Sequence, residues 1–456
     1  MKEDETPKDE NFLGVFFMRD VLCHKCCGIM EEEGRDKTDC FLEEIMKKFK
    51  QLFGMVIMCL LSTFVFAQNP FNMEENDYHK LLEQSIISEG NNFRLKQALN
   101  KIKNGEKTVI AAIGGSVTEG AGPADFKDGY AYQFFREIKK TYAPDGGKNV
   151  YFNNAGLSGT PSLLGCVRYQ SDVVKPMGQT PDILIIEFAV NDGGEVVFQR
   201  SFEALVRDAL TENPKTAVIA LYAAANYGNT SSQKKPISDY YKIPQINMLE
   251  IVKSSISTGK FSKSDYYTDS VHPTKKGHTM MKDCLMNLVK KVDNANQDEQ
   301  FDIPKNYWKS PSLSGIKQIL GEDKNVKISK GSFNQVDKQC QSIKKTNQSN
   351  FPVNWHKPMD LKSKNEPFTM EIKCKSFVFV YKVQSKNSST RFGKAEVYID
   401  GRLFETFDGA KEGGWNNCEQ KLLFYSSETR NHKIEVRMAE GSEKLGFTIV
   451  AMGYVE

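Results

Sequence analysis

The sequence predicts an α/β domain built on a doubly wound parallel sheet, followed by an all-β sandwich. Between residues 107 and 292, short apolar runs alternate with segments of helical periodicity, which is the pattern of a parallel sheet with helices on both faces. Beyond residue 310, short segments of alternating polarity follow one another without helices between them, as in a β-sandwich. A chain of 456 residues is also longer than a single hydrophobic core usually supports.

The α/β domain is expected over residues 80–295, and its first strand is expected at Thr108–Ile113. Every side chain of this strand is apolar or β-branched, which suits a parallel strand covered on both faces. The segment before it, 71–106, has the composition of polar helix. Further strands are expected at 150–153, 183–189 and 217–223, and helices at 130–142, 198–211, 243–256 and 274–292.

The second domain is expected over residues 311–456. Before it, residues 296–310 lose the periodicity and are rich in Asn, Asp, Gln and Pro, so we predict a linker there. Two of the sandwich strands are expected at 420–427 and 432–439. The pair Asp400-Gly401 predicts a tight hairpin turn between two others.

The segment 46–67 has the three parts of a secretory signal peptide. Three lysines form a basic head, an apolar centre follows, and Val65-Phe66-Ala67 provides a small-residue cleavage site. The apolar centre is shorter than the roughly 20 residues that a membrane span needs. We therefore expect a secreted, periplasmic or cell-surface protein with no stable membrane span after cleavage, and we expect residues 1–45 to be an upstream extension absent from the mature chain. An uncleaved anchor is the alternative.

The charge, the cysteine content and the motifs of the chain limit which partners, disulfides and cofactors are expected. The formal net charge is only +3 and no block of Lys and Arg or RNA-binding motif occurs, so nucleic acid is not expected as a partner. Five of the ten cysteines follow the signal segment, and this odd, widely spaced set is not a disulfide framework. Neither a metal ion nor a cofactor is implied by the motifs.

Ser116 is the candidate nucleophile. It follows Gly114-Gly115 just past the carboxyl end of the first strand, where the ligand crevice of an open α/β sheet lies. A serine hydroxyl needs a base and an orienting acid, and the loop Asp269-Ser270-Val271-His272 before the last helix offers both. We predict a triad of Ser116, His272 and Asp269. Capping of a helix is the alternative role for each of the three side chains.

Two loops that follow strands offer donors for a developing oxyanion. Gly159 offers an unhindered backbone N–H and Asn191 a side-chain amide, and the Ser116 N–H would complete a three-donor oxyanion hole. A turn role is the alternative for Asn191 and for Gly159, and Gly156 is the alternative donor in the same loop.

Four short blocks in this order carry a resemblance to a known family. They are Gly114-Gly115-Ser116-Val117, the Gly159 loop, Asn191-Asp192 and Asp269-x-x-His272, and over residues 105–292 they resemble the blocks of the SGNH (GDSL-like) hydrolase superfamily. The resemblance implies a three-layer α/β/α fold, the triad above and an oxyanion hole completed by Gly159 and Asn191. The first block departs from GDSL, having Gly115 for Asp and Val117 for Leu. Such variants occur in carbohydrate-esterase members.

The sequence therefore predicts a secreted serine esterase that removes acetyl or other short acyl groups from a polysaccharide or oligosaccharide, for example as an acetylxylan esterase. The alternatives are a lipase-like or lysophospholipase-like activity, acyl transfer to a sugar, or an inactive glycan-binding protein. Trp415 follows Gly413-Gly414 and is a candidate for stacking on a sugar ring, with core packing as its alternative role, as for Trp355.

Overall fold

The computed structural model describes residues 69–309, 312–320, 326–342, 351–360 and 365–456. The predicted signal peptide and the extension before it lie outside the described residues. From Asn69 to Glu456 the chain forms one compact unit. Within the described part, no helix has the length and apolarity that crossing a membrane requires.

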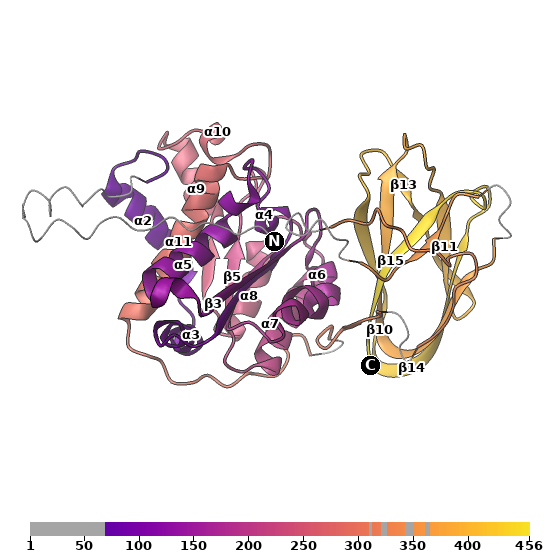
Figure 1. The fold of residues 1–456 in the computed structure, drawn as a ribbon, viewed down its shortest axis with the longest axis horizontal. Helices are drawn as coiled ribbons and strands as arrows, with labels where there is room; N and C mark the ends of the chain where they lie inside the picture. The colour runs from indigo at the N-terminus through magenta and orange to yellow at the C-terminus, as the bar shows by residue number, and fades with distance from the viewer. Residues whose placement is uncertain (1–68, 310–311, 321–325, 343–350, 361–364) are drawn as a thin grey trace, which may run out of the picture. The chain divides into compact units, whose positions relative to one another are not determined.

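A six-stranded sheet forms the centre of the α/β domain, with the strand order β1-β6-β5-β4-β2-β3 (Figure 1). All neighbouring strands pair in parallel except the edge strand β1, which pairs antiparallel with β6. The strands are β1 (Ile86–Ser88), β2 (Thr108–Gly114), β3 (Val150–Gly156), β4 (Ile183–Glu187), β5 (Ala217–Tyr222) and β6 (Gln245–Asn247).

Helices cover both faces of this sheet, which confirms the doubly wound prediction. In β2, Ile110 and Ala112 enter one hydrophobic core while Ala111 and Ile113 enter the other, as the two-residue period of a strand requires. The first core holds α2 (Glu75–Ser85), α3 (Phe93–Lys103), α5 (Tyr130–Tyr142), α9 (Leu249–Ser257) and α11 (Lys275–Asn294). The second holds α6 (Ser162–Tyr169), α7 (Val196–Glu212) and α8 (Ser231–Tyr240).

Two local expectations in this domain were wrong. The helix expected at 243–256 is divided, because residues 245–247 form β6 and pair with β5. Asn247 then accepts a hydrogen bond from the Leu249 N–H at 3.1 Å, and α9 begins there. Helix α8 was also not expected, because its interior holds Pro236, a residue that normally argues against a helix.

The second domain is all-β, as predicted. Its main sheet has the order β12-β11-β14-β10-β15-β7, and these neighbours pair antiparallel. Asp400 and Gly401 both have positive φ (52° and 79°) in the turn between β11 and β12, as an Asp-Gly hairpin turn requires. The strands are β7 (Lys317–Gln318), β8 (Val326–Ser329), β9 (Trp355–Lys357), β10 (Phe368–Ser385), β11 (Lys394–Ile399), β12 (Arg402–Asp408), β13 (Ala410–Lys411), β14 (Asn417–Met438) and β15 (Phe447–Val455).

The strands expected at 420–427 and 432–439 are parts of one long strand, β14. It pairs along the length of β10, and the register shifts between Cys374 and Ser376 and again between Phe377 and Val378. The first shift places three extra residues on β14 and the second places one. Such irregularities bend a strand without ending its pairing, and they absorb the interruption in the polarity pattern.

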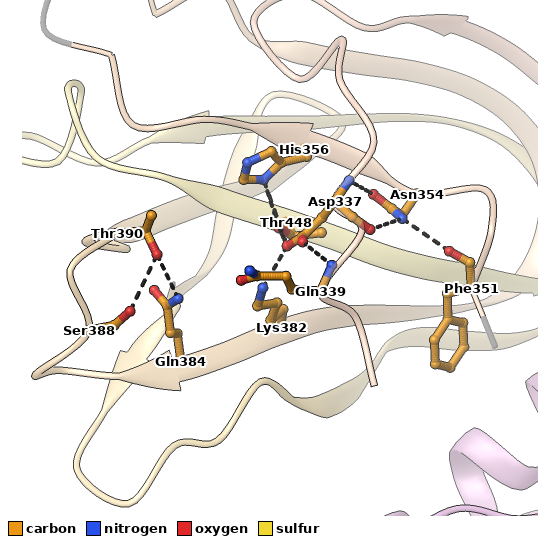
Figure 2. Close-up of polar contacts among 10 residues, drawn as sticks. All are labelled: Asp337, Gln339, Phe351, Asn354, His356, Lys382, Gln384, Ser388, Thr390 and Thr448. Atoms are coloured by element: carbon orange, nitrogen blue, oxygen red, sulfur yellow. Dashed lines mark hydrogen bonds and ion pairs between the residues drawn. The ribbon is translucent and has the colours of Figure 1, made fainter. Parts of the chain in front are cut away.

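A buried polar network stabilises the second domain around Asp337 (Figure 2). Its carboxylate accepts from Lys382 Nζ at 2.7 Å and from Thr448 Oγ1 at 2.8 Å. The Asn354 side chain accepts from the Asp337 N–H at 2.8 Å and donates to the Asp337 carbonyl at 3.1 Å. Lys382 and Asp337 are both buried, and such a charged pair is tolerated inside a protein only when it is hydrogen-bonded in this way. The network fixes the segment that leads to Gln341.

Candidate active site

The turn after β2 presents Ser116 through two glycines that leave no room for a side chain. A Cβ at Gly114 would lie 2.1 Å from Thr118 Oγ1, and one at Gly115 would lie 2.0 Å from Asn191 Oδ1. The short helix α4 (Ser116–Glu119) starts at once, and Ser116 is 7 % exposed. The glycine pair therefore allows the loop carrying Asn191 to approach the backbone beside the serine.

The structure brings Ser116, His272 and Asp269 together. His272 Nε2 lies 2.8 Å from Ser116 Oγ, and Nδ1 lies 2.6 Å from Asp269 Oδ2. With a neutral imidazole, this arrangement has the Nδ1–H donating to the carboxylate and the serine hydroxyl donating to Nε2. Proton transfer from the serine to the ring requires this geometry.

The loop that carries Asp269 and His272 is closed by its own hydrogen bonds. Asp269 Oδ1 accepts from the N–H groups of Val271 and His272 at 2.7 and 2.8 Å, and the Thr268 N–H donates to the His272 carbonyl at 2.9 Å. Burial alone would raise the pKa of the Asp269 carboxyl, but the hydrogen bonds from the His272 ring and from the two backbone N–H groups outweigh it and lower the pKa to about 2. The carboxylate therefore stays charged at neutral pH.

The predicted oxyanion donors lie on the loops after β3 and β4, the two strands that flank β2. Gly159 has φ +68°, a left-handed conformation that favours glycine. The Leu157 N–H donates to the Gly114 carbonyl at 3.0 Å, which ties the Gly159 loop to the turn before Ser116. Because the carboxyl ends of parallel strands share one edge of the sheet, Gly159, Ser116 and Asn191 follow one another along a single rim.

Asp192, named in the sequence analysis only as the neighbour of Asn191 in one of the four blocks, holds the two donor loops together. Its Oδ1 accepts from the Ser162 N–H at 2.7 Å, which joins the Asn191 loop to the segment after Gly159. Its Oδ2 lies 3.0 Å from the Nζ of Lys234, and both side chains are buried. Lys234 also donates to Thr230 Oγ1 at 2.7 Å. The only signal in the sequence was the adjacency of Asp192 to Asn191.

Glu187 ends β4 beneath the Asn191 loop and is fully buried. Its Oε1 accepts from the Ala189 N–H at 3.0 Å, while Oε2 has no hydrogen-bond partner among the described residues. Burial raises the pKa of Glu187 to about 7, and the nearby Asp192 carboxylate adds to that effect. Glu187 is therefore largely protonated at mildly acidic pH.

Arg168, which the sequence analysis missed, supports the ends of two strands. Its guanidinium donates to the Ala155 carbonyl at 2.6 Å and to the Gly114 carbonyl at 2.9 Å, and it pairs with Asp172 at 3.2 Å. A single arginine inside the apolar helix α6 was the available signal. Its side chain is completely buried, so these carbonyl contacts take the place of water.

The second domain reaches the Gly159 loop at two points. Gln341 Nε2 donates to the Ser158 carbonyl, and its Oε1 accepts from the Cys418 N–H at 3.1 Å. The Trp415 ring lies 3.2 Å from the place where a Cβ on Gly159 would be. Trp415 nevertheless remains 52 % exposed, whereas Trp355 is 3 % exposed and packs in the core. Of the two tryptophans, Trp415 alone lies beside a predicted site residue.

The other polar groups near the site serve the fold. His278 is buried and accepts at Nδ1 from the Tyr130 N–H at 3.1 Å, while its Nε2 lies 2.9 Å from the Ala121 carbonyl. Burial lowers the pKa of His278 to about 4, so it stays neutral. Among the described residues, no group of three or more His, Cys, Asp or Glu side chains could hold a metal ion.

Part of the α/β domain resembles a known family. Residues 112–280 match the sequence profile of the GDSL-like Lipase/Acylhydrolase family. The matched segment lies within the α/β domain, which is therefore similar to GDSL-like hydrolases. The match confirms the family resemblance and the prediction of a carboxylic ester hydrolase.

The GDSL-like domain and the all-β domain together resemble solved structures. Two structures of a two-domain esterase (CEX) active on acetylated mannans, one co-crystallized with mannopentaose, match with TM-scores of 0.68 and 0.69 at 22 % identity. Both matches cover 82 % of this chain, and they cover 99 % and 98 % of the other chain. The likeness shows a shared two-domain fold. A search of curated proteins found no match.

Replacing Gly115 by alanine should disable the site without unfolding the domain. The new Cβ would displace Asn191, and loss of one oxyanion donor typically lowers the rate roughly 10²–10³-fold. We expect kcat on p-nitrophenyl acetate to fall by about that factor, with circular dichroism unchanged. Gly194→Ala is the matched control, since a Cβ there meets only Gln233 Nε2 at 3.6 Å. Full activity in Gly115→Ala would contradict the role of Asn191.

Glu187→Gln should change how stability depends on pH. The folded chain keeps a proton on Glu187 that the unfolded chain releases above its ordinary pKa of 4.5. The Glu187 contribution to stability should therefore fall by up to about 3 kcal/mol as pH rises from ~4.5 through ~7 and then level off. In the variant the Glu187 contribution should be absent, so urea unfolding at pH 5 and pH 8 should show a smaller loss of stability than in the native protein. Burial also raises the pKa of Asp208 to about 7, and its contribution should remain in both proteins. Glu440→Gln, at an exposed position, should retain it. A loss of stability in Glu187→Gln as large as in the native protein would contradict the assignment.

Proposed function

We propose that this protein is a serine esterase that removes acetyl groups from a polysaccharide, with an acetylated mannan as the first candidate substrate. The observation that carries the proposal is the hydrogen-bonded chain from Ser116 through His272 to Asp269. The family match supports ester hydrolysis, and the CEX esterase of similar fold, which is active on acetylated mannans, suggests the substrate class.

The proposed reaction has two halves. Ser116 Oγ attacks the ester carbonyl carbon while its proton passes to His272 Nε2, and the developing oxyanion is held by the N–H groups of Ser116 and Gly159 and the amide of Asn191. The imidazolium, stabilised by Asp269, then gives its proton to the departing sugar oxygen, which leaves an acyl-serine. A water molecule next attacks the acyl carbon and gives a proton to His272. Collapse of that intermediate returns the proton to Ser116 and releases the acid.

Export is part of the proposal. The segment 46–67 has the composition of a signal peptide, and structural polysaccharides such as mannan lie outside the cell membrane. We infer that the mature protein begins near Gln68 and works outside the cytoplasm.

Ser116→Ala should abolish release of acetate from acetylated polysaccharide, because Ser116 Oγ is the hydroxyl bonded to His272 Nε2 and supplies the attacking oxygen. Acetate release from acetylated mannan, xylan and chitin-type substrates is the measurement, with p-nitrophenyl acetate alongside. Ser257→Ala, an exposed serine hydroxyl on α9, is the control that should keep full activity. Unchanged turnover in Ser116→Ala would refute the mechanism. A preference for p-nitrophenyl esters of long acyl chains would instead indicate a lipase-like enzyme.

Trp415→Ala should weaken binding of polymer without changing the chemistry. An exposed indole beside Gly159 offers a rigid apolar face to a sugar ring, so its loss should raise KM for acetylated mannan about tenfold. The kcat on p-nitrophenyl acetate should stay the same. Leu403→Ala on β12, also 52 % exposed, should leave both substrates unaffected. An unaltered KM for polymer in Trp415→Ala would remove this residue from the binding surface.

A further inference from the structure

We propose that Tyr227 forms a second substrate-binding platform, on the side of Ser116 away from Trp415. The inference rests on the proposed function, because it assigns part of the surface that would hold the polysaccharide. Tyr227 is 68 % exposed, the largest exposed fraction among the large apolar and aromatic side chains of the described residues. Isolated exposed aromatic residues are common on protein surfaces, so the position of Tyr227 in the fold is what points to a role.

Tyr227 lies at the tip of a closed turn after β5. The Ala225 N–H donates to the Gly228 carbonyl at 3.1 Å, and the Gly228 N–H donates to the Ala225 carbonyl at 3.0 Å. Gly228 has φ +130°, which side-chain-bearing residues rarely adopt. Asn229 anchors the base of the turn, because its Nδ2 donates to the Ala223 carbonyl at 2.8 Å. The backbone under Tyr227 is thus fixed although its ring is exposed.

This turn is bonded to two of the loops that would carry the reaction. The Asn226 N–H donates to the Ser270 carbonyl at 2.9 Å, inside the loop that holds Asp269 and His272. On the other side, the Thr230 N–H and hydroxyl donate to the Ala189 carbonyl at 2.9 and 3.0 Å, just before Asn191. Tyr227 is therefore positioned by the same backbone that positions the base and one oxyanion donor.

The strand order places the exposed side chains of Trp415 and Tyr227 on opposite sides of Ser116. Along the rim, the loops follow β3, β2, β4 and β5, which carry Gly159, Ser116, Asn191 and Tyr227 in that order. Trp415 lies at the Gly159 end. Neighbouring strands are about 4.8 Å apart, so the rim from β3 to β5 spans roughly 14 Å. A polysaccharide lying along this rim would present its ester at Ser116 and further sugars to an aromatic ring at each end.

A phenol ring suits this task. It offers a flat apolar face for a sugar ring, a hydroxyl for hydrogen bonding at its edge, and little conformational freedom to lose on binding. The proposal therefore assigns to Tyr227 the recognition of a sugar unit distant from the scissile ester, and no part in the chemical step.

The test compares Tyr227→Ala, Tyr227→Phe and the native enzyme on acetylated mannan and on p-nitrophenyl acetate. We expect Tyr227→Ala to raise KM for polymer about tenfold while its kcat, and its kcat/KM for p-nitrophenyl acetate, stay unchanged. Tyr227→Phe should stay near the native value, because it keeps the ring. Tyr151→Ala is the matched control. Tyr151 is 47 % exposed near the start of β3, so it lies at the amino ends of the strands, away from the rim that carries Ser116.

Each contrary outcome has a separate meaning. An unchanged KM for polymer in Tyr227→Ala, with the native enzyme active on polymer, overturns this inference and leaves the proposed function standing. Equal losses on polymer and on p-nitrophenyl acetate overturn it as well, because they show that Tyr227 holds the His272 loop instead of the substrate. A native enzyme that releases no acetate from any acetylated polysaccharide overturns both proposals.

Discussion

The site depends on the close approach of three backbone segments at Gly114 and Gly115. A Cβ at Gly114 would lie 2.4 Å from the Glu187 carbonyl as well as against Thr118, and one at Gly115 would occupy the place of the Asn191 amide. With no side chains there, α4 starts directly at the end of β2 and the Asn191 loop packs beside it. Gly156 continues this packing on the other side, because a Cβ there would lie 2.1 Å from the Glu119 N atom. Ser116 and its proposed oxyanion donors lie close together because a glycine stands at each of these two backbone contacts.

Such dense packing at strand ends leaves backbone polar groups away from water, and buried side chains bond to them. The Arg168 guanidinium donates hydrogen bonds to the Gly114 and Ala155 carbonyls. The Asp192 carboxylate accepts one from the Ser162 N–H, and the Glu187 carboxyl accepts one from the Ala189 N–H. A buried charge costs free energy unless it is paired, and the structure pairs Asp192 with Lys234 and Arg168 with Asp172. Glu187, with no cation bonded to it, instead holds its proton up to about pH 7. The polar layer beneath the site thus stabilises loop positions and is separate from the groups that would react.

The features that could be predicted from the sequence are those that depend on residues close together in the chain. The alternation of apolar and amphipathic segments gives the doubly wound sheet, and the spacing of Asp269 and His272 lets one short loop hold both. The elements that were not predicted depend on contacts between segments that lie far apart in the chain. Residues 245–247 became a strand because β5 offers pairing partners, and α8 forms around Pro236 because Ile237 is buried in the second core. Tertiary packing outweighs local propensity in both cases.

The contacts of the second domain with the Gly159 loop bear on what this domain does. A tethered binding module would touch the hydrolase only through its linker, but here Gln341 bonds to Ser158 and Trp415 packs on Gly159. Gln341 follows a segment fixed by Asp337, whose pairing with Lys382 is buried inside the second domain. The second core also continues from Val167 of α6 to Ile316 and Val450. A loop that supplies a proposed oxyanion donor is thereby packed on both domains, so loss of the second domain would remove part of that loop's support as well as the exposed indole. The all-β domain therefore forms one side of the site, and the chain is best treated as one catalytic unit.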